Sequence, residues 1–100
     1  MILTTTNTIE GYKIVDYLGI VSGVGANNRK ASFSFKIEKF LESLENSINE
    51  VKEDAFQKLK QNALKLQANA VVGIDIDFET LPDTTYILVS VTGTAVKVSQ

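Results

Sequence analysis

The stretch Ala70-Val71-Val72-Gly73-Ile74-Asp75-Ile76-Asp77-Phe78-Glu79 decides the fold, because it directly follows a long amphipathic helical pattern. Apolar and acidic residues alternate along it. The apolar row is Val72, Ile74, Ile76 and Phe78, and the carboxylate row is Asp75, Asp77 and Glu79. Since successive strand side chains point to opposite faces, the pattern predicts a strand with one hydrophobic and one acidic face.

The residues before this strand predict one long helix. Apolar residues recur at steps of three and four in two successive runs. The first is Leu41, Leu44, Ile48, Val51 and Ala55, and the second is Phe56, Leu59, Ala63, Leu66 and Ala70. A helix over 46–69 alone would be about 36 Å long. We expect it to stop at Gln67-Ala68-Asn69, with Asn69 as a left-handed cap. Residues 29–40 fit a strand or a helical lead-in, and the helical interpretation is preferred.

Three further segments have strand patterns: 1–6, 12–24 and 85–98. Gly23 and Gly25 are expected in the loop that ends the second of them, and together with Gly19 they are interpreted as bulge or barrel-closure glycines. Residues 81–84 have turn chemistry. The prediction is one α+β domain over residues 1–100, in the order β-β-α-β-β, with a helix on an antiparallel sheet and a hairpin at the C-terminal end.

Composition removes several classes of function. The chain has 100 residues, 44% of them hydrophobic, a net charge of −2, and no cysteine or histidine. No basic stripe predicts a nucleic-acid partner, and the chain has no thiol, no imidazole base and no soft-metal ligand set. There is neither a secretory signal pattern nor an apolar run of about eighteen residues, so we expect a cytosolic, soluble protein without a membrane partner.

The apolar residues outnumber what one helix can cover. Segment 12–24 is apolar on both faces, and the last strand keeps Tyr86, Leu88, Val96 and Val98 on its second face. Exposed apolar patches of that size mark interfaces in soluble proteins. Self-association is therefore expected, with sheets that pack together or join into a closed barrel. The alternative is a monomer in which residues 27–40 fold over the second face.

Asp75, Asp77 and Glu79 are the candidate metal ligands, for a hard cation such as Ca²⁺ or Mg²⁺. Neighbours in the row lie roughly 6.6–7 Å apart along a strand, so carboxylates of another strand or subunit would have to complete the site. The preferred interpretation is a solvated face whose charges discourage edge-to-edge pairing. No catalytic residue and no cofactor is expected, because no histidine, cleft-forming segment or aromatic platform accompanies the carboxylates.

Several motifs resemble the YbjQ-like family of small bacterial proteins. They are Ala68-Asn69-Ala70 with the stretch that follows to Glu79, Ser90-Val91-Thr92-Gly93-Thr94-Ala95-Val96-Lys97, Thr4-Thr5, Glu10-Gly11, Gly25-Ala26-Asn27 and Ala55-Phe56. The resemblance covers nearly the whole chain and departs from the family at 29–45. It implies an α+β subunit similar to the dodecin-like group, assembled into a ring of expected pentameric size. The family's heavy-metal-binding label is not a demonstrated activity, and it is not carried over to this chain.

The leading hypothesis is thus a non-enzymatic cytosolic protein that forms a ring with a central barrel and acts as a scaffold or binding module. One alternative is binding of a divalent cation by carboxylates of neighbouring subunits. The other is a carrier that holds a small ligand in clefts between subunits.

Overall fold

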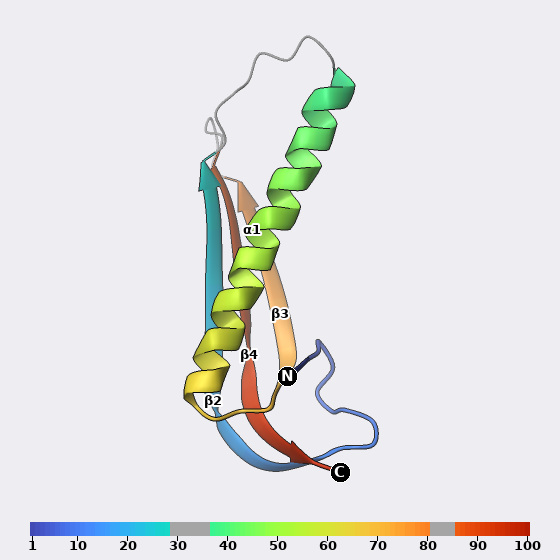
Figure 1. Cartoon of the computed structure of the whole chain (residues 1–100), viewed down its shortest axis with the longest axis vertical. Helices are drawn as coiled ribbons and strands as arrows, with labels where there is room; N and C mark the ends of the chain where they lie inside the picture. Colours follow the sequence, from blue (N-terminus) through green and yellow to red (C-terminus); the bar gives the residue numbers. More distant parts are fainter. Residues whose placement is uncertain (29–36, 81–85) are drawn as a thin grey trace.

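The computed structural model describes residues 1–28, 37–80 and 86–100, without the side chains of residues 27, 28 and 37–47. The strands are β1 (Ile2–Leu3), β2 (Lys13–Asn28), β3 (Ala70–Thr80) and β4 (Tyr86–Ser99), and helix α1 (Ile37–Lys65) crosses one face of the sheet (Figure 1). The predicted order β-β-α-β-β is confirmed. The turn expected at 81–84 and the lead-in at 29–36 lie outside the described residues, whereas 37–40 are helical.

The sheet is mixed rather than wholly antiparallel. Its strand order is β1-β3-β4-β2, and β4 runs antiparallel to both of its neighbours, which confirms the C-terminal hairpin. Short β1 pairs parallel to β3, with Ile2 opposite Ala70. The prediction failed here because β1 and β3 are far apart in sequence. No hairpin therefore constrains their relative direction.

Strand β2 continues through Gly23 and Gly25, which were expected in a loop after it. Both glycines face α1. A Cβ atom on Gly23 would clash with the carbonyl oxygen of Ala55, and one on Gly25 with that of Val51. These two residues therefore let the helix backbone rest directly on the strand. Of the three glycines that we interpreted as bulge residues, Gly19 alone lies at a register shift, with φ +136°.

The main core lies between α1 and the sheet. Helix residues Val51, Ala55, Leu59 and Ala63 are buried there, as the helical periodicity predicted. Opposite them lies the buried odd-numbered row of β4: Ile87, Val89, Val91 and Ala95. Helical steps and strand alternation therefore identified most of both layers. The predicted stripe was wrong at its end, because Leu66 is 40% exposed and Ala70 belongs to β3, where it is buried on the other face.

The helix ends in a Schellman motif, with Gln67 in the left-handed conformation (φ 63°) that had been expected of Asn69. The amide of Ala68 donates to the carbonyl of Ala63 (3.1 Å), and that of Gln67 donates to Leu64 (2.9 Å). Asn69 instead bonds the backbone of β4. Its side chain accepts from the amide of Val98 (2.8 Å) and donates to the carbonyl of the same residue (2.9 Å).

A β-bulge at Gly73 divides the apolar row that we predicted along β3. Gly73 has φ +61°, and the register with β4 shifts between Val72 and Asp75. Val71 and Ile74 consequently pack under α1, while Val72 packs on the opposite face. The prediction of one row from Val72 to Phe78 was wrong because a bulge inserts one residue and so reverses the alternation.

A second, smaller core covers part of the face away from α1. Ala70, Val72, Val96 and Val98 are buried there, and Ile2, Ile9 and Ile14 pack against them. Val96 and Val98 were expected to stay uncovered until another subunit met them. The chain covers them itself, because its N-terminal segment, which loops out beside β3 to the start of β2 (Figure 1), supplies Ile2 and Ile9 to this core.

We predict that Gly23→Ala destabilises the fold by roughly 1–3 kcal/mol, because the helix backbone must retreat from the added methyl group. Urea unfolding would measure the loss. Ser22→Ala on the same strand is the control and should change stability by less than about 0.5 kcal/mol, since Ser22 is exposed. Equal stability of the two variants would contradict the close contact.

We predict that Gln67→Gly stabilises the fold by about 0.5–1 kcal/mol, because glycine adopts the left-handed conformation without the steric cost of a Cβ atom. The matched control is Gln61→Gly inside α1, which should lose about 1 kcal/mol. Thermal unfolding separates the two by the sign of the change in Tm. A loss of stability in Gln67→Gly would show that the glutamine side chain itself matters.

Candidate functional site

The most distinctive surface is the part of the sheet that neither α1 nor the second core covers, which we call the open face. The pairing register places three rows side by side on it. Strand β2 contributes a mainly apolar row, β4 a row of hydroxyls, and β3 the carboxylates. The members are Tyr17, Ile20, Ser22 and Val24 of β2, Thr94, Thr92 and Ser90 of β4, and Asp75, Asp77 and Glu79 of β3.

The apolar strip, defined as Tyr17, Ile20 and Val24, is strongly exposed. Relative exposures are 70% for Tyr17, 80% for Ile20 and 45% for Val24. The irregularity of β2 between Tyr17 and Gly19 brings Tyr17 and Ile20 onto one face. A strip of large apolar side chains on one sheet face is typical of a surface that another protein covers.

The carboxylate row lies on the open face, as predicted, and all three of its members are exposed. In register across β4, Asp75 lies opposite Thr92, and Asp77 opposite Ser90. Among the side chains that the structure describes, no group of three or more acidic residues is gathered closely enough to hold a metal ion. A single copy of the chain thus supplies a row of solvated charges, and a cation site there would need ligands from a second copy.

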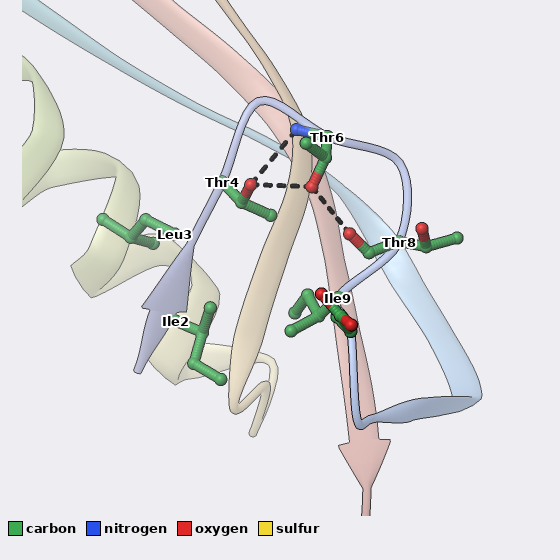
Figure 2. A pocket seen from close by; sticks show the side chains of 7 residues that line it. Ile2, Leu3, Thr4, Thr6, Thr8 and Ile9 are labelled. Carbon is green, nitrogen blue, oxygen red and sulfur yellow. Dashed lines mark hydrogen bonds between the residues drawn. The ribbon is translucent and has the colours of Figure 1, made fainter.

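A hollow of about 690 Å³ lies beside the N-terminal segment and is lined by Ile2, Leu3, Thr4, Thr6, Thr8, Ile9 and Glu10 (Figure 2). The hydroxyls of Thr4 and Thr6 bond to each other and to the backbone. Thr4 Oγ1 and Thr6 Oγ1 are 2.8 Å apart, and Thr6 Oγ1 donates to the carbonyl of Thr8 (2.6 Å). These bonds hold the loop in shape, so the hydroxyls are largely committed to the fold rather than to a ligand.

The sheet ends at β2 on one side and at β1 and β3 on the other. Strand β2 ends the sheet on one side, and on the other side β3 extends past its bonds with the N-terminal segment, the last of which is from the Ile74 amide to the Thr4 carbonyl (3.1 Å). Beyond that point Ile76 and Phe78 face the helix side and stay 42% and 45% exposed. The predicted apolar wall of β3 is thus only partly covered, because α1 lies mainly over β2 and β4 (Figure 1).

Sequence reasoning missed two polar residues of α1 whose side chains donate hydrogen bonds to the backbone of β2. Lys58 Nζ donates to the carbonyl of Val24 (3.0 Å), and Asn62 Nδ2 donates to the carbonyl of Ser22 (2.8 Å). The signal was present as a four-residue spacing beside the apolar stripe. It could not be used before the partner strand was known.

No helix in the described part of the chain is long and apolar enough to cross a membrane.

Comparisons with known proteins agree along the full length. The model of the YbjQ family, described as "Putative heavy-metal-binding", matches residues 1–99. A UPF0145 protein of Anoxybacillus flavithermus is 43% identical over 106 residues and covers 100% of both chains. One from Geobacillus thermodenitrificans is 45% identical and covers 98% of this chain and 99% of its own.

Among solved structures, a crystal structure of a protein with unknown function from Pediococcus pentosaceus, of the DUF74 family, has the same fold. Its TM-score is 0.72 at 22% sequence identity, and the match covers 99% of this chain and 98% of that one. This similarity supports the α+β arrangement of one helix on a four-stranded sheet.

We predict that Ca²⁺, Mg²⁺ and Mn²⁺ shift the Tm of the parent protein and of Asp75→Asn/Asp77→Asn by the same small amount, because exposed charges two residues apart form no first shell. Differential scanning calorimetry with and without chelator is the measurement. Glu50→Gln/Glu53→Gln on α1 removes the same charge elsewhere and serves as the control. A rise of several degrees in the parent and in this control, absent in the aspartate variant, would establish a cation site.

Proposed function

We propose that this chain, which belongs to the YbjQ family, is one subunit of a cytosolic homo-oligomeric ring that acts as a scaffold or binding module and catalyses no reaction. The observation that carries the proposal is the apolar strip on the open face, where Ile20 is 80% exposed. In water such a strip favours association, at about 25 cal/mol for each Å² of apolar surface buried. A second copy of the chain is its proposed cover.

The geometry favours a closed ring over a face-to-face dimer. The apolar strip lies along β2 at one side of the sheet, whereas the exposed Ile76 and Phe78 lie on β3 at the other side. A contact between two different surfaces of the same chain is head-to-tail, and it closes into a ring when the rotation permits. A ring of five, and a subunit arrangement similar to the dodecin-like group, rest on the family resemblance.

The non-enzymatic part of the proposal rests on chemistry. The chain contains no histidine or cysteine, so its serine and threonine hydroxyls have no imidazole base to activate them. The family's heavy-metal description fits poorly for the same reason, because soft metals prefer thiolate and imidazole ligands. A divalent cation held by carboxylates of neighbouring subunits, or a small ligand held between subunits, are the competing functions.

We predict that Ile20→Asp converts the assembly into monomers while the fold persists, since Ile20 contributes little to the core of a single subunit. Native mass spectrometry reports the mass, and circular dichroism reports the fold. Gln61→Asp, which adds the same charge on the exposed side of α1, is the control and should keep the parent mass.

The same spectra discriminate between the competing functions. A pentameric mass without adduct supports the scaffold, bound metal that is lost on chelation supports the cation site, and an additional small-molecule mass supports the carrier. A monomeric parent protein would contradict the assembly itself.

A further inference from the structure

The outer edge of β2 is the longest strand edge of the fold, because β2 ends the sheet and runs from Lys13 to Asn28. An uncovered strand edge presents a row of unpaired N–H and C=O groups to which another chain can add a strand. In a ring of copies, this edge would be the obvious place for the sheet to continue from one subunit into the next.

Two helix side chains occupy the middle of that edge. Residues of an antiparallel strand direct their backbone groups alternately to the two sides, so Ser22 and Val24 share one side. Their carbonyls accept from Asn62 (2.8 Å) and Lys58 (3.0 Å), whereas backbone partners in the sheet lie only on the other side. An incoming strand would have to displace both donors.

The fold brings the two donors to the strand. Gly23 and Gly25 allow α1 to rest on the β2 backbone, so side chains on the flank of the helix reach over the strand. Lys58 is also paired with Asp54 at 3.0 Å on the same helix. The ammonium group of Lys58 contacts Asp54 and the Val24 carbonyl at the same time. The ion pair thus limits the positions of this group to those near the strand.

The first half of β2 is closed in a different way. Register shifts occur between Ile14 and Asp16 and between Tyr17 and Gly19. Bulges interrupt the regular spacing of edge groups and twist the strand, which natural sheets use to discourage edge pairing. The edge is thus irregular up to Gly19 and occupied at Ser22 and Val24.

We infer that α1, through Lys58 and Asn62, closes the outer edge of β2 to strand addition. Copies of the chain therefore meet at β2 through the side chains of the apolar strip and not through its backbone. A barrel that is continuous across β2, which the sequence had suggested, is excluded by this inference. The inference rests on the proposed assembly for the second copy, whereas the closed edge is a property of each subunit.

The first test is hydrogen exchange of the Ser22 and Val24 amides, which share the outer side with the bonded carbonyls. We expect both amides to exchange equally fast in the assembled parent and in the Ile20→Asp variant. Protection of these amides in the assembled protein alone would mean that a neighbouring strand pairs there, and it would overturn the inference. Native mass spectrometry of the same samples reports whether assembly itself occurs, so failure of the proposed function is seen separately.

The second test removes the donors with Lys58→Ala/Asn62→Ala. We expect species larger than the parent assembly and a rise in thioflavin T fluorescence at temperatures below the Tm of the variant. Lys58→Arg/Asn62→Gln retains both donors, and Lys60→Ala/Gln61→Ala alters the same helix elsewhere. Both should behave like the parent. An unchanged mass and fluorescence in the alanine variant would overturn the closed edge, whether or not the parent forms a ring.

Discussion

Helix α1 lies against strand β2 so closely that Gly23 and Gly25 have no room for a Cβ atom. Much of the remaining arrangement depends on this contact. It sets the helix over β2 and β4, and it leaves Ile76 and Phe78 of β3 partly exposed. It also places one side of the helix next to the sheet edge, where Lys58 and Asn62 donate hydrogen bonds to the β2 backbone. Small residues on a strand thus determine both the core and the surface.

The opposite face of the sheet is covered at one end and open further along. The N-terminal segment covers one end of it and buries Val96 and Val98 in a second core. Nothing in the described part of the chain covers Tyr17 and Ile20 further along. When a chain covers only part of a two-sided sheet, apolar surface remains in water. Contacts that bury this surface are then favourable.

The sequence predicted the repeating parts of this fold well. Helical steps identified Val51, Ala55 and Leu59 as core, and the odd row of β4 was placed correctly. The carboxylate row was placed on one face of β3, where the structure has it. The sequence predicted a strand that is apolar on both faces, but it did not predict which residues form the apolar strip. Its membership depends on the irregularity of β2 between Tyr17 and Gly19, where alternation counted along the sequence loses its phase.

Local pattern by itself determined the order of elements, the buried stripe of α1 and the absence of thiol and imidazole chemistry, because these follow from residue types and their spacing. Tertiary structure alone decided the parallel pairing of β1, the bulge at Gly73 and the contact of α1 with Gly23. Each of these depends on segments distant in sequence, whose approach no local periodicity records. A glycine in a strand often indicates the close approach of another backbone, and only the tertiary structure shows which segment approaches.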